Sequence, residues 1–208
     1  MTTITRRLKA WVPVFLIGGL LSGIACAAAA PQDLVKQTSQ RMLQALRAEK
    51  AQIKKNPEHL KKLVDEIVLP HFDFHKMSKL VLGRYWRRAS DDQQQHFIDE
   101  FRTLLVRTYT SALSQYTGQT IDYLPFNGDP ASGDVTVRTE VQQRGASPIP
   151  IDYSLMRENG EWKVYDVTIG GVSLVINYRS SFASEIRHAG IDALIDKLHH
   201  RNHKNSDG

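Results

Sequence analysis

The first half of the chain carries apolar residues three and four positions apart, which is the spacing of one face of an α-helix. This pattern predicts helices over residues 32–55, 60–68, 73–83 and 90–118. The clearest helix start is Ser90–Gln93, a capping box that also places two acidic residues at the positive end of the helix dipole. The helix that follows it has the broadest apolar face and is the longest predicted element.

In the second half the apolar period changes from 3.6 to 2, which is typical of half-buried strands. Strands are predicted over residues 121–124, 135–141, 151–155 and 162–169. Asn159-Gly160, between the last two, predicts a tight hairpin turn. A block of helices followed by antiparallel strands favours the α+β class, with a sheet of four to five strands packed on several helices.

Two further helices are predicted after the strands. Residues 172–188 form the first, Gly190 interrupts the pattern, and residues 191–198 form the second. The polar residues 199–208 are predicted to be a flexible tail.

The N-terminus has the three parts of a secretory signal peptide. Basic residues at positions 6, 7 and 9 precede an apolar stretch over residues 11–21, and small residues follow over 25–30. Ala27 and Ala29 fit the two small positions before a cut, so residues 1–29 are predicted to be removed. Residues 30–198 then form one domain.

Two alternatives for this segment fit less well. A transmembrane anchor needs about 20 strongly apolar residues, whereas Pro13 and several glycines interrupt this stretch. A lipoprotein would carry its lipid on Cys26, but Gly23 stands where such signals normally have leucine. Export with release, and hence a periplasmic location, is the favoured interpretation.

Removal of the leader changes the charge of the chain. The formal net charge of the 208 residues is +5, and without the three basic residues of the leader it is about +2. Because no concentrated basic face remains, we expect no nucleic-acid partner. Cys26 is the only cysteine and leaves with the leader, so we expect a core-stabilised chain without an internal disulfide.

Candidate metal ligands and catalytic motifs are sparse. His71, Asp73 and His75 lie close together, but the flanking phenylalanines favour a helix cap at Asp73 over a metal site. His199, His200 and His203 are interpreted as part of the solvated tail, where adventitious zinc binding is possible. The chain has no Gly-x-Ser-x-Gly motif, phosphate-binding glycine loop or dinucleotide fingerprint. We therefore predict no catalytic residue, no metal and no cofactor.

The strongest functional candidates are apolar and tyrosine side chains on the faces of the long helix and the strands. If the sheet curls around that helix, these faces line a slot, although the same pattern also fits a solidly packed core. The predicted pocket residues are Phe101, Leu105, Tyr109, Leu113, Tyr153, Leu155, Val167, Ile169, Val172 and Leu174.

A basic and aromatic cluster precedes the capping box. Arg84 and Arg87 flank Tyr85-Trp86, and arginine forks suit phosphate groups. The cluster predicts a contact with a phosphate head group or an acidic partner. The alternative is a loop whose aromatic rings pack inward while the arginines stay in water.

Several sequence blocks, in this order, resemble the MlaC family of periplasmic phospholipid-binding proteins, also known as toluene-tolerance auxiliary components. The resemblance covers residues 33–198, and Gly170 departs from it where members often have an acidic residue. The matching blocks are Phe72–Phe74, Leu80–Trp86, Phe97–Tyr109, Gly118–Thr120, Trp162–Val167 and Gly171–Phe182.

The resemblance implies an NTF2-like sheet and a helical part that enclose a hydrophobic pocket for acyl tails, with the head group near solvent. It implies phospholipid as cargo and two docking partners, the outer-membrane MlaA–porin complex and the inner-membrane MlaD ring of an ABC transporter. The expected role is to shuttle phospholipid between the two membranes and so maintain outer-membrane lipid asymmetry. We expect a monomer.

Two other functions stay open. One is a periplasmic enzyme on an NTF2-like scaffold, for which Asp122, Asp152 and Asp166 are the nearest candidate acid–base residues. The other is a protein-interaction adaptor with a solid core. A carrier is favoured because burial of acyl chains needs apolar faces and little catalytic chemistry.

Overall fold

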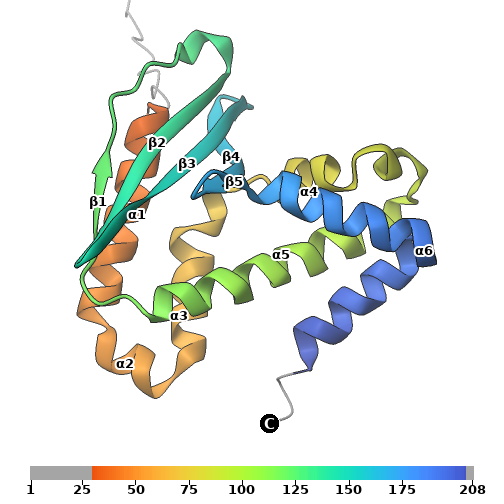
Figure 1. Ribbon diagram of the computed structural model, residues 1–208, viewed down its shortest axis with the longest axis horizontal. Coiled ribbons are helices and arrows are strands. Elements are labelled where there is room, and N and C mark those ends of the chain that lie inside the picture. The colour runs from red at the N-terminus through yellow and green to blue at the C-terminus, as the bar shows by residue number, and fades with distance from the viewer. Residues whose placement is uncertain (1–29, 205–208) are drawn as a thin grey trace, which may run out of the picture.

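The computed structural model describes residues 30–204, so the predicted signal peptide over residues 1–29 lies outside the described residues (Figure 1). The helices are α1 (Pro31–Ala48), α2 (Lys50–Lys55), α3 (Pro57–Ile67), α4 (Phe74–Leu82), α5 (Asp91–Ser114) and α6 (Leu174–His203). The strands are β1 (Thr120–Tyr123), β2 (Asp134–Gln143), β3 (Ala146–Glu158), β4 (Glu161–Ile169) and β5 (Val172–Ser173). Three 3₁₀ turns are η1 (Leu69–His71), η2 (Gly83–Arg88) and η3 (Pro130–Ser132).

Local side-chain chemistry sets the starts of the central helices, as predicted. The Asp73 carboxylate accepts a backbone N–H three residues on, at 2.8 Å, and starts α4. Ser90 and Gln93 form the reciprocal capping box of α5, with N–O distances of 3.2 and 3.0 Å. The single helix predicted over residues 32–55 is instead two helices, since the backbone leaves the helical region at Glu49.

The sheet is an antiparallel meander in the order β1-β2-β3-β4-β5, which confirms the α+β class and the expected number of strands. It stands at one end of the molecule together with α1, whereas α4 and α6 lie toward the other end and α5 runs between the two ends (Figure 1). The helix predicted to begin at Val172 begins only at Leu174, because Val172 and Ser173 pair with Ile169 and Thr168 of β4.

A bulge interrupts β4 and changes which of its side chains face inward. Opposite Ser154-Leu155 of β3, the pairing skips Tyr165 of β4. The extra residue shifts the two-residue alternation by one position. Val164 and Val167, three residues apart, are therefore both buried against the same neighbours.

The core has three clusters of buried side chains. The sheet cluster joins one face of the sheet, called here the inner face, to α1 and the start of α6: Val35, Val135, Val137, Leu155, Trp162, Val164, Val167 and Leu174. The helical cluster joins α4, α5 and α6, with Met77, Val81, Phe97, Phe101, Leu105 and Phe182 among its members. The third cluster joins α1, α3 and α5: Met42, Leu46, Leu60, Leu63, Val64, Ile67 and Val106.

Aromatic rings hold α5 and α6 together inside the helical cluster. Phe97 and Phe101 stack with their centroids 5.6 Å apart. Phe182 meets both of them edge-on, at 5.8 and 6.0 Å, and Tyr178 meets Phe101 edge-on at 5.3 Å. These are the arrangements that aromatic pairs favour.

Helix α6 folds back on itself and extends beyond its predicted end. Gly190 has φ 88° and ψ 174°, a conformation that favours glycine, and the chain kinks there. The second half of α6 continues through His203, so the prediction of a flexible tail from residue 199 is wrong for residues 199–203. The buried Asn202 side chain explains the difference, because its amide donates to the carboxylate and the carbonyl of Glu100 on α5.

No helix in the part of the chain that the structure describes has the length and apolar character that a membrane crossing requires.

One half-buried carboxylate joins the sheet to α6. Asp166 Oδ1 accepts the backbone N–H of Val167 at 2.8 Å and that of Val175 at 3.1 Å. Asp166 Oδ2 accepts the hydroxyl of Ser173, the residue whose side chain caps α6. The two oxygens together hold the first turn of α6 against β4.

We predict that Asp166→Ala lowers the free energy of unfolding by about 2 kcal/mol, because hydrogen bonds to a charged group typically contribute about 1.5–3 kcal/mol. Urea denaturation followed by circular dichroism measures the change. The matched control is Asp152→Ala. Asp152 lies on β3, on the opposite face of the strand from Tyr153, so only a small change in the free energy of unfolding is expected for this variant. Equal losses in both variants would contradict the assigned role.

Candidate functional site

The inner face of the sheet becomes progressively more exposed toward one end. Leu155 and Val167 are buried, whereas Ile169 is half-buried and Val172 has 54% of its surface exposed. The strand register places Ile151, Ile169 and Val172 side by side across β3, β4 and β5. We call these three residues and Ile149, two positions before Ile151 on β3, the apolar strip.

Four residues after Val172, the first turn of α6 carries another exposed apolar side chain, that of Ile176, with 66% of its surface exposed. Ile149, Val172 and Ile176 are the large hydrophobic side chains that the described structure leaves exposed. Ile149 and Val172 lie at the same end of the sheet, because Ile149 is two residues from Ile151, whose partner Ile169 pairs with Val172. Apolar residues scattered on a surface are ordinary, whereas contiguous ones mark binding sites.

Three tyrosines pack against the buried clusters near the sheet. Tyr109 of α5 and Tyr178 of α6 each pack against both the sheet cluster and the helical cluster, and Tyr153 of β3 packs against the sheet cluster. Burial raises the pKa of Tyr109 and of Tyr153 to about 12. The phenols are therefore uncharged at neutral pH, and they offer polar hydroxyls within an otherwise apolar surface.

The structure brings most of the predicted pocket residues together, but not all of them. Six belong to the sheet cluster or pack on it: Tyr109, Tyr153, Leu155, Val167, Ile169 and Leu174. Phe101 and Leu105 lie in the helical cluster, and Leu113 packs on the third cluster. Val172 is at the exposed end of the apolar strip.

Sequence reasoning did not single out Ile149, Ile151 or Tyr178 as site residues. Ile151 alternates with Tyr153 and Leu155, so strand periodicity was a sufficient signal for it. Tyr178 had no such signal, because its position between two clusters depends on how α6 crosses the sheet and α5.

Arg84 and Arg87 lie on η2, in the helical part of the molecule. Both are exposed, and Arg84 donates to the Tyr85 hydroxyl at 2.9 Å with its guanidinium 4.9 Å from the ring centroid. Trp86 of the same turn packs in the helical cluster. Their predicted contact with a head group or a partner stays a prediction.

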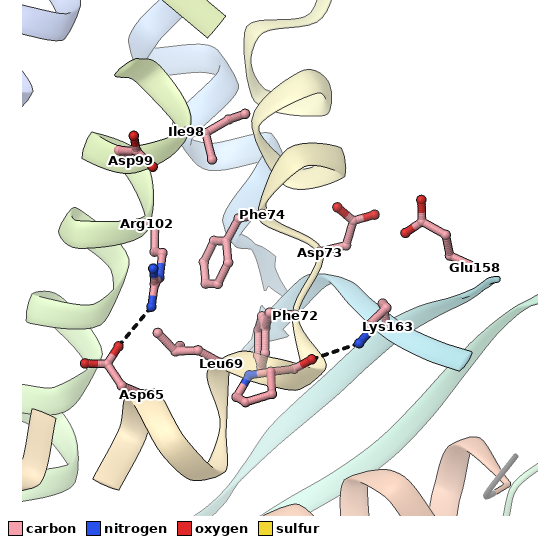
Figure 2. A pocket seen from close by; sticks show the side chains of 11 residues that line it. Asp65, Leu69, Phe72, Asp73, Phe74, Ile98, Asp99, Arg102, Glu158 and Lys163 are labelled. Atoms are coloured by element: carbon pink, nitrogen blue, oxygen red, sulfur yellow. Dashed lines mark hydrogen bonds and ion pairs between the residues drawn. The ribbon is translucent and has the colours of Figure 1, made fainter. Parts of the chain in front are cut away.

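A separate open hollow of about 490 Å³ lies between α3, α4, α5 and β4. Figure 2 shows Phe72 and Phe74 between the Arg102–Asp65 ion pair on one side and Lys163 on the other. The apolar lining of this hollow consists of Leu69, Pro70, Phe72, Phe74 and Ile98, and charged side chains surround these residues. The predicted pocket residues are not among the residues that line it.

The residues weighed for metal or acid–base chemistry near the strands have other contacts. Asp73 caps α4, and the His75 ring meets Trp86 edge-on at 5.1 Å. Asp122 is exposed and accepts a hydrogen bond from the Gln142 side chain.

The other two candidate acid–base residues, Asp152 and Asp166, lie elsewhere on the sheet. Asp152 is on the opposite face from Tyr153, in register with Arg138, and Asp166 anchors α6. Neither of these positions belongs to the apolar strip.

Comparison with known proteins agrees with this geometry. The family described as MlaC protein matches residues 36–200. The intermembrane phospholipid transport system binding protein MlaC of Haemophilus influenzae is 28% identical over 92% of both chains. The toluene tolerance protein ttg2D of Pseudomonas putida is 31% identical over 81% of this chain and 79% of its own.

A solved structure has the same fold. The phospholipid-binding protein from Ralstonia solanacearum, solved in complex with a phospholipid, has a TM-score of 0.79 and 33% sequence identity. The match covers 85% of this chain and 98% of that one. Because the family match spans most of the chain and the fold agrees over nearly all of a relative, this chain belongs to the MlaC family.

Proposed function

We propose that this protein binds phospholipid by its acyl tails and carries it between membranes. The observation that carries the proposal is the likeness to the Ralstonia solanacearum protein, which was solved with a phospholipid bound. The names of the Haemophilus influenzae and Pseudomonas putida relatives, which refer to phospholipid transport and toluene tolerance, support the same function.

The apolar strip supplies the entrance for the tails. Each methylene transferred from water to an apolar surface contributes about 0.8 kcal/mol, so acyl chains gain most where apolar side chains are exposed. Ile149, Val172 and Ile176 provide that surface, and the half-buried Ile151 and Ile169 lead from it toward the core.

The tails continue inward between the sheet and α5. Tyr109 and Tyr178 contact both the sheet cluster and the helical cluster, so their side chains must rotate for a chain to pass between the clusters. Burial raises the pKa of Tyr109 to about 12, so this phenol carries no charge when it moves. The head group remains at the open end, near water.

The proposal extends to location and partners. The signal peptide over residues 1–29 delivers the mature chain to the periplasm, where it acts as a monomer. It receives or delivers its cargo at the outer-membrane MlaA–porin complex and at the inner-membrane MlaD ring, and so maintains outer-membrane lipid asymmetry. Arg84 and Arg87 are the proposed contact for a head group or for one of these partners.

An enzyme and a lipid-free adaptor are the competing functions, and lipid extraction separates them from a carrier. We expect organic-solvent extraction of the purified mature protein, followed by mass spectrometry, to yield about one phospholipid per chain. An adaptor yields none. Extraction of an unrelated exported protein from the same cells provides the background, and a yield no higher than this background would overturn the proposal.

A charge within the apolar strip is predicted to expel the lipid. Ile169→Lys places an ammonium group against the acyl chains, and a loss of 1.4 kcal/mol already corresponds to about tenfold weaker binding. We therefore expect the amount of lipid recovered per chain to fall at least tenfold. Thr168→Lys is the matched control, because Thr168 precedes Ile169 on β4 and lies on the opposite face of the strand. This variant should retain its lipid.

Val172→Lys tests the same surface if Ile169→Lys fails to fold, because Val172 is already 54% exposed. Thermal unfolding checks the fold of each variant. Full lipid content in a folded Ile169→Lys or Val172→Lys protein would remove the apolar strip from the site.

A further inference from the structure

The last turns of α6, which run back beside α5, bring two histidines together with a glutamate of that helix (Figure 1). His199 and His203 are one helical turn apart, and their ring centroids are separated by 4.2 Å. Glu100 reaches them from α5, and its Oε1 lies 2.7 Å from Nδ1 of His199. One ligand-type atom from each of these three side chains lies within 4.8 Å of the other two.

The hydrogen bonds of the two rings leave the same nitrogen free on each. A carboxylate and a carbonyl oxygen only accept, so Nδ1 of His199 donates to Glu100, and Nδ1 of His203 donates to the carbonyl of His199 at 2.8 Å. In the neutral rings the lone pair therefore resides on Nε2. This is the arrangement in which metal-ligating histidines are found, with the second nitrogen bound to a carboxylate or a backbone carbonyl.

The supporting glutamate is itself held in place. Asn202, which has 4% of its surface exposed, donates to Oε2 of Glu100 at 2.7 Å and to its backbone carbonyl at 2.9 Å. The Glu100 side chain is 14% exposed. The carboxylate is therefore positioned before any ligand arrives, which distinguishes the cluster from freely moving histidines on a surface.

We propose that His199 and His203 bind a divalent transition-metal ion, Zn²⁺ in the first instance, through their Nε2 atoms, and that Glu100 orients His199 for this purpose. Imidazole nitrogen is a preferred ligand of zinc, copper and nickel. Two protein ligands leave further coordination positions for water or another donor, so the site is open and binds its ion reversibly. This inference does not depend on phospholipid binding.

The neighbouring side chains supply a control. His200 is adjacent in sequence, but its ring centroid is 6.2 Å from that of His199 and it is not part of the three-residue group. Arg201 and Lys204 border a different hollow together with Arg107 of α5. A general affinity of the histidine-rich segment for metal would include His200, whereas the proposed site does not.

The test is isothermal titration calorimetry of ZnCl₂ into the mature protein, made without a polyhistidine tag and first treated with a chelator. We expect one zinc ion per chain and a zinc-dependent rise in Tm, because an ion that binds the folded state stabilises it. His199→Ala and His203→Ala should abolish both effects, and His200→Ala should leave both unchanged. Glu100→Gln should weaken binding by about 10–100-fold, as is typical when such a supporting group is removed.

The Tm of each variant without zinc identifies any loss that comes from misfolding. If His203→Ala proves unstable, His203→Gln serves in its place, since that position is exposed. The proposal is overturned if zinc does not saturate at one ion per chain, or if a folded His203 variant binds zinc as tightly as the original. Loss of binding in His200→Ala alone would overturn it as well.

Discussion

The arrangement of this protein depends on the carboxylate of Asp166. Its two oxygens accept hydrogen bonds from β4, from the residue that caps α6, and from the first turn of α6 itself. The start of α4 is also tied to β4, by the hydrogen bond from the Asp73 N–H to the Val164 carbonyl. Apart from the Asp166 junction, α6 packs on the sheet through apolar and tyrosine side chains such as Leu174 and Tyr178, and such contacts favour proximity but do not set an angle. The junction fixes where α6 leaves the sheet, and with it the positions of Tyr178 and Ile176. At the open end of the inner face, this junction acts together with the pairing of β5 and with the hydrogen bond from the Gly170 N–H to the Pro150 carbonyl.

Much of the fold could be predicted from the sequence because the signals are local. Asp73 and Ser90 cap helices through contacts three residues away, and such contacts are visible in a short stretch of sequence. The bulge at Tyr165 was not predictable in this way, because an extra residue in one strand has meaning only against the register of its partner. The continuation of α6 through residues 199–203 was missed for a similar reason. His199 and Asn202 are polar, and their partner Glu100 is about a hundred residues earlier in the chain.

The candidate site shows the same division. Alternation along β3 correctly indicated which face of that strand is apolar, whereas on β4 the bulge puts Val164 and Val167, which strict alternation would separate, on the same face. The alternation did not indicate how deeply each side chain is buried. Leu155, with 0% of its surface exposed, and Val172, with 54% exposed, were therefore predicted alike. Helical periodicity placed Phe101, Tyr109 and Leu113 on one broad face of α5, yet these three residues contact different clusters, because α5 spans the molecule and meets different elements along its length. Exposure and neighbours are properties of the assembled structure.

The two edges of the sheet carry a consequence for solubility. An unpaired strand edge can recruit a second copy of the same chain, and this hazard is greater for a protein that also shows apolar side chains to water. Here the longest strands, β2 and β3, are interior to the meander, and the outermost strands β1 and β5 have only four and two residues. Part of the β4 edge that β5 leaves open is occupied by the start of α4, where Phe72 bridges Val164 and the Asp73 N–H donates to the Val164 carbonyl. The molecule can therefore expose apolar side chains while leaving only a limited strand edge for pairing with a second copy.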